Sequence, residues 1–460
     1  MKRESLSLKA SSACNVAILA AAISVCIPGR ASSNELDDVL QTYGPLEWIA
    51  GLNGQSSVNG NEWNDADGLP ATEAELSEPH SAAGDLMGNV YVADKNAHAI
   101  RRIDPDGIIH TVAGTNTAGF DGDGPARQKQ LNGPQNAYPM PDGSFYILDT
   151  GNQMIRRVDP KGQMTTVMVE TAGLSRGLWV KRDASVIYYC TTTALKRWTP
   201  ARGTSPGMTM ASGFSECGNI DVAANGDVYL TDRGAINAAP GGSRVYRIIP
   251  NATPSTFMPV PVAGVGGGTN SGPGSNGELA MDVGLLGVRG IAFHPRGGFF
   301  VATHKGGDIW YVDTAGAASV VVNGDDGNSH DSSPAYLPTG SNTISEARFV
   351  SVALNGDLLM ATNDAGYIRR ARYLGPNPAS ANVSGVRLTG SNSLRIEWNT
   401  PPNAWYSLES SRDPAASLWS PLAVGPAPAA GMLSSWTGDP LTGVNPRLFY
   451  RIRTFRAWPN

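Results

Sequence analysis

The stretch that decides the fold is Gly88-Asn89-Val90-Tyr91-Val92-Ala93-Asp94, followed by Ile100-Arg101-Arg102-Ile103-Asp104-Pro105-Asp106-Gly107. The same pattern returns as Gly143-Ser144-Phe145-Tyr146-Ile147-Leu148-Asp149 and Ile155-Arg156-Arg157-Val158-Asp159-Pro160-Lys161-Gly162. Short apolar runs separated by Gly-containing turns are typical of antiparallel strands that follow one another along the chain. Each copy is therefore predicted to form a β-meander.

Four weaker copies follow, at Val186 to Cys190, Gly226 to Asp232, Gly297 to Thr303 and Gly356 to Thr362. The six copies recur on average about every 54 residues, which leaves room for insertions between them. One small sheet cannot bury both of its faces, whereas radial packing of several sheets covers both. The repeats therefore predict an all-β chain with a six-bladed β-propeller over residues 34–374.

The two ends of the repeat region complement each other. The last copy stops at Tyr373-Leu374 without an outer strand, while Leu46-Glu47-Trp48-Ile49-Ala50-Gly51 stands alone before the first copy. That segment matches the outer strand of the first copy, Ile109 to Gly114. We therefore predict that Leu46 to Ala50 completes the sixth blade and closes the ring.

Residues 79 to 170 resemble NHL repeats in their residue pattern. The resemblance rests on Pro79, Gly88 to Asp94, His98, Ile100-Arg101-Arg102 and Thr111-Val112-Ala113-Gly114, and on the linker Gly119 to Ala126. It implies a six-bladed propeller used mostly for binding, with a minority of enzymes such as amidating lyases. The third copy departs from the pattern, because Cys190 stands where the family has Asp, and the fourth carries an insertion around Gly234 to Gly242.

The first thirty-three residues are typical of a secretory signal. Basic residues lie between Met1 and Lys9, an apolar run extends from Ala13 to Ile27, and Ala31 and Ser33 supply small side chains before the predicted cleavage after Ser33. An uncleaved anchor is the alternative. The prediction is a protein secreted to the periplasm or the medium, with no stable membrane span after cleavage.

The net charge and the cysteine content indicate which kinds of partner and which covalent bonds to expect. The formal net charge is -5, and removing residues 1–33 leaves 31 Lys and Arg against 39 Asp and Glu, so the chain has no overall attraction for nucleic acid. Cys190 and Cys217 then remain as the cysteines of a compartment that permits disulfides. We predict that they form a disulfide, with free thiols as the alternative.

A second β domain is predicted after a linker at residues 375–382. Residues 383–460 contain short strand patterns and resemble a small fibronectin-like sandwich, through Tyr406-Ser407-Leu408-Glu409-Ser410-Ser411, Trp419 and Phe449-Tyr450-Arg451. The tryptophans Trp398, Trp405, Trp419 and Trp436 are interpreted as core residues rather than as a sugar-stacking platform.

Candidate ligand-binding residues follow from the register of the repeats. Counting eight residues back from each turn places one residue of every blade at the start of its innermost strand, namely His80, Gln135, Arg176, Gly218, Arg289 and Arg348, with Asn136 and Asn219 next in line. No carboxylate occurs in either row, so a positively charged channel mouth is expected. Guanidinium groups pair bidentately with carboxylate or phosphate, which favours an anionic ligand. The alternative is that these arginines bond loop carbonyls, Asp121 or Asp123.

The sequence gives little support for a catalytic metal site or for a nucleophilic residue. A zinc site needs several converging histidines, and His80 alone falls on the predicted mouth, although His294 and His304 could approach each other. No cofactor is predicted; Asp65 to Gly68 and Asp121 to Gly124 are interpreted as turns, with structural calcium as the alternative.

Two functions remain in view. The first is a non-catalytic scaffold whose mouth and long loops bind an extracellular glycan, peptide or protein ligand; the loops are 51–78, 114–133, 264–287 and 324–346. The second is an enzyme of the lyase or lactone-hydrolase kind. It would use His80 or His294 as general base, with Arg289 and Arg348 holding a substrate carboxylate.

Overall fold

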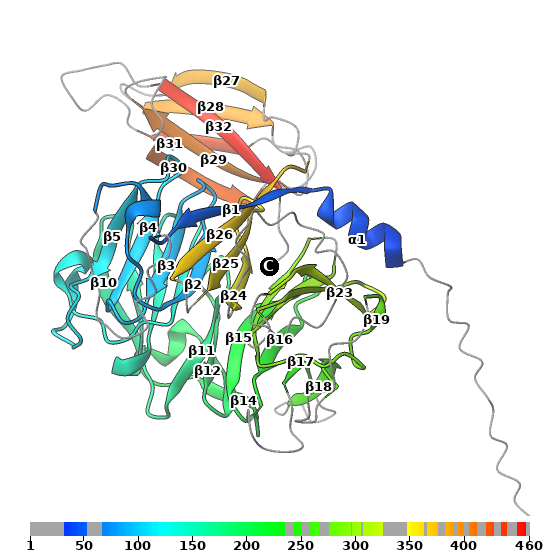
Figure 1. Cartoon of the computed structure of the whole chain (residues 1–460). Helices are drawn as coiled ribbons and strands as arrows, with labels where there is room; N and C mark the ends of the chain where they lie inside the picture. Colours follow the sequence, from blue (N-terminus) through cyan, green and yellow to red (C-terminus); the bar gives the residue numbers. More distant parts are fainter. Residues whose placement is uncertain are drawn as a thin grey trace, which may run out of the picture. The chain divides into compact units, whose positions relative to one another are not determined.

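The computed structural model describes most of the chain from Ser32 onward (Figure 1). The described residues are 32–52, 67–234, 243–250, 257–265, 276–295, 297–304, 307–324, 347–362, 366–375, 382–389, 393–399, 404–411, 420–426, 434–438 and 449–456. The predicted signal segment up to residue 31 lies outside them, and so do parts of three predicted loops, at 53–66, 266–275 and 325–346. Within the described residues no helix has the length and apolar character that a membrane crossing requires.

Six antiparallel sheets form the propeller, and each opens with an inner strand (Figure 1). The inner strands are β2 (Pro79–Gly84), β7 (Asn136–Pro139), β11 (Leu174–Val180), β15 (Cys217–Val222), β20 (Val288–Phe293) and β24 (Ala347–Val352). Each inner strand contacts the inner strands of both neighbouring blades, so the six strands surround a central channel.

The other strands follow in meander order, as predicted. The second strands are β3 (Val90–Asp94), β8 (Phe145–Asp149), β12 (Ile187–Thr191), β16 (Val228–Asp232), β21 (Phe299–Thr303) and β25 (Leu358–Thr362). The third strands are β4 (Ala99–Ile103), β9 (Met154–Val158), β13 (Ala194–Trp198), β17 (Arg244–Pro250), β22 (Ile309–Val312) and β26 (Tyr367–Tyr373). The outer strands are β5 (Ile109–Gly114), β10 (Gln163–Val169), β14 (Met208–Ser212), β18 (Phe257–Ala263), β23 (Ala317–Val322) and β1 (Tyr43–Ala50).

Several short elements supplement the four main strands of each blade. Two-residue strands β6 (Gly124–Pro125) and β19 (Glu278–Leu279) add a fifth strand to the second and fifth blades. The 3-10 turns are η1 (Ala71–Glu73), η2 (Ala126–Gln128), η3 (Thr150–Asn152) and η4 (Pro200–Arg202). The sequence did not predict helix α1 (Ser32–Leu40), whose Leu36 and Val39 are buried against Phe300 and Tyr311.

The predicted closure of the ring is confirmed. Strand β1 pairs antiparallel with β26, and Leu46 lies opposite Ala371. Glu47 reinforces the junction, because its carboxylate accepts hydrogen bonds from Arg370 and Arg372, each at 3.0 Å. Leu46 and Ala50 are buried, so this strand contributes apolar surface as well as backbone pairing.

A repeated aspartate anchors the loop that leads into the inner strand. Asp94 accepts a hydrogen bond from the Ser77 N–H at 2.6 Å, and Asp232 accepts one from the Glu216 N–H at 2.8 Å. Each aspartate ends the second strand of its blade. The conspicuous Asp of the repeat therefore fixes where the inner strand begins.

The two calcium-like loops supply carboxylates to protein groups. Asp67 accepts hydrogen bonds from the N–H of Thr111 at 2.6 Å and from Arg127. Asp123 accepts hydrogen bonds from the buried Arg156 at 3.0 Å and from Thr166 at 2.8 Å. Asp65 and Ala66 lie outside the described residues, so the interpretation of both loops as turns stays a prediction.

The C-terminal region contains two three-stranded sheets. The strands are β27 (Asn382–Thr389), β28 (Ser393–Asn399) and β31 (Ser434–Gly438) in one sheet, and β30 (Ser420–Pro426), β29 (Ala404–Ser411) and β32 (Phe449–Arg456) in the other. Trp398 is fully buried in a cluster with Ile396 and Leu408, as predicted for a core tryptophan. The fibronectin-like sandwich itself stays a prediction.

Candidate functional site

Three of the predicted residues occupy β-bulges at the start of inner strands. The pairing of β2 with β3 passes from Pro79 to Ser81 and skips His80. In the same way, Arg289 and Arg348 are skipped where β20 and β24 pair with their second strands. A bulge bends the strand and redirects the side chain of the extra residue. One local irregularity, repeated around the ring, therefore directs His80, Arg289 and Arg348 to a common place.

The arginines that the register analysis selected, Arg176, Arg289 and Arg348, lie close enough to interact through charge, and Arg233 joins them. Burial lowers the pKa of Arg289 to about 8, and repulsion by the guanidiniums of Arg176, Arg348 and Arg233 contributes further. The pKa of Arg176 is lowered to about 10 by burial, followed by the charge of Arg348. Side chains from blades that are far apart in the sequence thus act on one another through charge. We call Arg176, Arg233, Arg289 and Arg348 the arginine cluster.

Two carboxylates that the register analysis missed balance part of this charge. Glu78 lies 3.3 Å from Arg348 and 2.8 Å from Lys95, and Glu216 lies 2.9 Å from Arg233 and 3.8 Å from Arg176. Both glutamates precede the first residue of an inner strand by one position. Glu78 adopts a left-handed backbone (φ 63°), a conformation that is costly for a residue with a side chain.

The glutamates correct one part of the sequence interpretation. The expectation of a mouth without carboxylates is wrong, because Glu78 and Glu216 lie there. Asp121 and Asp123, the alternative partners for the arginines, instead accept hydrogen bonds from the Gln130 backbone N–H and from Arg156. The sequence does carry a signal for the correct partners. Ser77-Glu78 and Ser215-Glu216 occupy equivalent positions in the first and fourth blades. The second strands of those blades end in Asp94 and Asp232, and a basic residue, Lys95 or Arg233, follows each.

Arg289 keeps donors without a partner. Arg289 is buried, with 3% of its surface exposed. Its Nε and Nη1 atoms have no hydrogen-bond partner in the described part of the chain. A guanidinium buried in this way costs free energy unless another group neutralises it. Arg289 therefore retains hydrogen-bond donors that no group in the described part of the chain uses.

Two histidines border the arginine cluster. His80 Nε2 lies 3.2 Å from Glu78 and 3.4 Å from Arg348, and burial is the main cause that lowers its pKa to about 3. The backbone N–H of His304 donates to the carbonyl of Gly287 at 3.0 Å, and burial, followed by the charge of Arg289, lowers the pKa of the His304 imidazole to about 2. Both imidazoles are neutral at pH 7.

His294 does not join them. It follows the far end of β20 and packs edge-on against Tyr43, Phe300 and Tyr311, with ring centroids 6.0 to 6.3 Å apart. His304 instead lies beside the residue that precedes β20. The expectation that His294 and His304 could approach each other is wrong, because the length of β20 separates them.

Two of the predicted amides, Asn136 and Asn219, lie within the inner strands β7 and β15, and Gln135 lies one residue before β7. Asn136 donates a hydrogen bond to the carbonyl of Arg176 at 3.1 Å, which ties the second blade to the third. Gln135 is half-buried just before β7, and Asn219 is 4% exposed within β15. The side-chain oxygens of Gln135, Asn136 and Asn219 are buried without a hydrogen-bond partner in the described chain. These amides thus retain acceptor capacity.

Cys190 and Cys217 meet at the junction of the third and fourth blades. Both are fully buried thiols in the structure, and burial followed by the neighbouring Cys217 raises the pKa of Cys190. Gly177 makes room for them, since a Cβ at this position would lie 2.8 Å from the Cys190 sulfur. The disulfide stays a prediction, which the position of these side chains makes testable.

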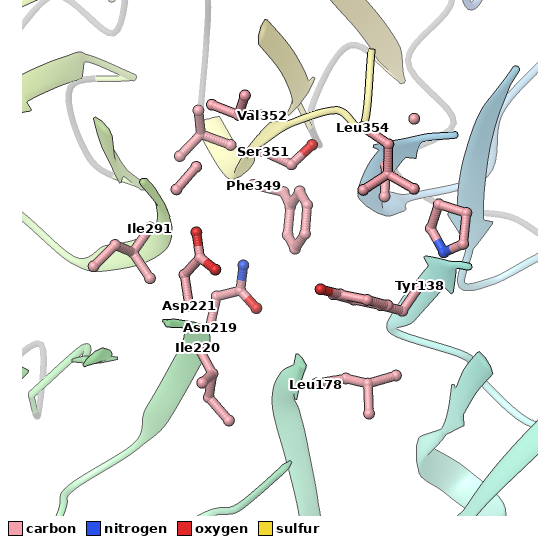
Figure 2. Close-up of a pocket in the computed structure, with 15 residues that line it drawn as sticks. Tyr138, Leu178, Asn219, Ile220, Asp221, Ile291, Phe349, Ser351, Val352 and Leu354 are labelled. Carbon is pink, nitrogen blue, oxygen red and sulfur yellow. The ribbon is translucent and has the colours of Figure 1, made fainter. Parts of the chain in front are cut away.

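A cavity of about 80 Å³ lies in the channel beyond the arginine layer (Figure 2). All six inner strands line it, and the side chains that shape it include Phe349, Leu178, Ile291, Asn219, Asp221 and Tyr138. A neighbouring cavity of about 70 Å³ shares Tyr138, Asp221 and Leu354 and is also lined by His294. The channel therefore contains a second, less charged compartment that the sequence analysis did not find.

Known proteins match both the repeats and the architecture. Residues 33–120 match the family model described as the Teneurin NHL domain. Together with the observed topology, this match decides the type of repeat. The chain contains an NHL-repeat six-bladed β-propeller.

Two sequence relatives match shorter segments. Protein SUPPRESSOR OF QUENCHING 1, chloroplastic, from Arabidopsis thaliana is 33% identical over 131 residues, which cover 28% of this chain and 12% of that protein. Teneurin-3 from Mus musculus is 34% identical over 105 residues, which cover 20% of this chain and 4% of that protein. The matched region of this NHL propeller thus spans at most 12% of these relatives.

Solved structures resemble the NHL propeller at low sequence identity. An auxiliary nutrient binding protein from Bacteroides thetaiotaomicron VPI-5482 has a TM-score of 0.52 and 13% identity, covering 72% of this chain and 76% of that one. The protein of the same description from Bacteroides ovatus ATCC 8483 has a TM-score of 0.53 and 13% identity, covering 72% and 77%. At this identity the likeness concerns the fold.

Proposed function

We propose that this protein is an exported, non-catalytic binding protein whose propeller mouth holds an anionic group of an extracellular ligand. The observation that carries the proposal is Arg289, a buried guanidinium with donors left over, set among Arg176, Arg233 and Arg348. A carboxylate, sulfate or phosphate would supply both the missing acceptors and the opposing charge. Such groups occur in acidic glycans and at peptide C-termini.

The likeness to nutrient-binding propellers supports a role in binding rather than a particular ligand. Export follows from the predicted signal segment, and the periplasm and the medium remain equivalent for this proposal. In either compartment Glu78 and Glu216 would hold the arginines in place before a ligand arrives. A ligand that meets prearranged donors loses less of its binding free energy to ordering the site.

The alternative from the sequence, a lyase or lactone hydrolase, has less support from the geometry. His294 lies among aromatic rings at the other end of β20. His80 does border the arginine cluster, but its pKa of about 3 makes it a weak base near neutral pH, where general bases work best with a pKa close to the pH. We therefore favour binding over general-base catalysis.

Calorimetric titration with defined anions tests the proposal. The probes are glucuronate, a sulfated disaccharide and inorganic phosphate, each at low ionic strength because salt screens exposed charges. We expect at least one probe to bind, and the Arg289→Ala/Arg348→Ala double variant to bind it at least tenfold more weakly. Arg247→Ala is the matched control, because Arg247 pairs with Asp227 on the outside of the fourth blade. Equal binding by the double variant and the wild type would refute the anion site.

A further inference from the structure

The cavity beyond the arginine layer has walls and polar groups of its own (Figure 2). Phe349, Leu178 and Ile291 supply apolar surface from three different blades. Figure 2 shows the carboxyl group of Asp221, the amide of Asn219 and the hydroxyl of Tyr138 turned toward the centre. A concave apolar pocket with a few convergent polar groups is the usual form of a small-molecule site.

Asn219 is the residue that most clearly lacks a partner here. It is 4% exposed, and its side-chain oxygen is buried without a hydrogen bond in the described part of the chain. Its backbone is held in place, because its N–H donates to Thr231 at 2.9 Å. A buried amide that is fixed but unsatisfied is costly, so the site is complementary to a group that bonds it.

The polar groups together match hydroxyls. An amide and a phenol can each donate and accept, a carboxylate accepts, and a hydroxyl group offers one donor with two acceptor lone pairs. Asp221 already accepts the N–H of Phe293 at 2.7 Å, which fixes the direction of its carboxyl group. A ligand that carries two or more hydroxyls could therefore bond Asn219, Asp221 and Tyr138 at once.

Charge selects against ionic ligands in this compartment. The carboxyl group of Asp221 interacts with the guanidinium of Arg182, so the two charges offset each other. An anion would meet the carboxylate directly, while a cation would face the arginine cluster at the mouth of the same channel. A neutral molecule avoids both costs.

The structure assigns a second binding site to this cavity, for a small neutral hydroxylated molecule such as a polyol or one sugar unit. The volume of about 80 Å³, with the adjoining space of about 70 Å³, exceeds several times the roughly 10–15 Å³ that a cavity needs to hold one water. The site is separate from the proposed anion site, because its polar groups come from residues other than the arginines.

Saturation-transfer NMR and calorimetry on the full chain test this site, with glycerol, D-xylose, D-glucose and myo-inositol as probes. We expect at least one probe to bind with a Kd in the millimolar range or below. Asn219→Leu and Tyr138→Phe should each weaken that binding about tenfold, the usual effect of losing one buried hydrogen bond. Tyr146→Phe is the matched control, because Tyr146 pairs directly with Tyr138 but does not line the cavity.

The two proposals fail separately. Arg289→Ala should remove anion binding and leave the affinity for the neutral probe within twofold of the wild type. Absence of binding for all four probes at 50 mM, with ordered water alone on Asn219 in a crystal structure, would overturn the second site. Binding that Asn219→Leu and Tyr138→Phe both leave unchanged would overturn it too, as would stronger binding of ethanolamine than of any polyol.

Discussion

The two compartments of the channel are built from the same six strands and differ sharply in charge. At the mouth, Arg289 and Arg348 stand on bulges beside the start of their strands. A residue or two further along, Ile291 and Phe349 turn apolar side chains into the cavity. A single scaffold thus presents an ionic surface and a largely apolar pocket within a short distance along each strand.

In this propeller, the residues that stabilise the fold are largely separate from those proposed to bind ligands. Blade-to-blade packing is carried by apolar residues such as Phe300 and Ile147, which are fully buried. The mouth, in contrast, contains like charges that oppose folding, and two glutamates compensate for part of them. Substitutions in the packing should affect both compartments together, while substitutions at the mouth should affect one.

The largest expected effect comes from opening the ring. Leu46→Asp would place a charge in the buried pairing of β1 with β26, next to Ala371. We expect the free energy of unfolding to fall by about 4 kcal/mol, the size typical of a buried unpaired charge. Denaturant unfolding measures the loss, and both compartments should lose their ligands. Loss of one ligand alone would show that the compartments do not share the closed ring.

The predicted disulfide between Cys190 and Cys217 has the next largest expected effect on stability. Cys217 lies one residue before Gly218, the fourth blade's residue in the predicted row at the channel mouth. If the predicted disulfide forms after export, mass spectrometry should find two hydrogens fewer than in the reduced chain. Reduction should then lower the stability by about 3 kcal/mol. Cys190→Ser/Cys217→Ser is the control, and its stability should not respond to reductant. Two free thiols in protein purified from its export compartment would contradict the prediction.

Histidine at the mouth makes stability depend on pH. The pKa of His80 is lowered from about 6.5 to about 3, so below pH 6.5 the unfolded chain takes up a proton that the folded one refuses. The contribution of His80 to the free energy of unfolding is fully present above pH 6.5 and decreases as the pH falls below that value. Between pH 7 and 5 the wild type should lose about 2 kcal/mol relative to His80→Gln.

The comparison with His80→Gln is needed because other groups act in the opposite direction. Burial raises the pKa of Asp94 to about 7, which favours the folded state as the pH falls. Both proteins share that contribution, so the difference between their unfolding curves isolates His80, with Glu78, Arg176, Arg348 and Lys95 as its charged neighbours. Parallel pH profiles would show that the environment of His80 has been misjudged.

The smallest effect distinguishes a binding arginine from a structural one. Arg289→Met removes a buried charge and retains most of the apolar volume, so we expect stability to rise by about 1 kcal/mol while anion binding is lost. Thermal and denaturant unfolding at low salt measure the change. A fall of 1 kcal/mol or more would indicate that Arg289 mainly holds the fold together.

Much of this architecture could be predicted from the sequence, because it depends on short repeated patterns. The meander order, the six blades and the pairing of Leu46 with the last blade all follow from matched strands and turns. Helix α1 was not predicted, because the contacts that hold it, such as that of Glu35 with Tyr311, link residues far apart in the chain. No local pattern records a contact of that kind.

The site was predicted in part for the same reason. Register placed His80, Arg176, Arg289 and Arg348 in one row, and β-bulges redirect three of these side chains, those of His80, Arg289 and Arg348. Glu78 and Glu216 were missed because they lie one position outside the counted row. The cavity at Asn219 and Asp221 depends on the side-chain volumes of six strands together, which a single sequence does not disclose.

The most direct test of the anion site is a crystal structure of the full chain soaked in selenate, using the anomalous signal of selenium. We expect a selenate ion within hydrogen-bond distance of the Arg289 guanidinium, and its loss in Arg289→Met. Selenate bound only at partly exposed arginines on the outer strands, such as Arg157 and Arg247, with none at the mouth of the wild type, would contradict the anion site.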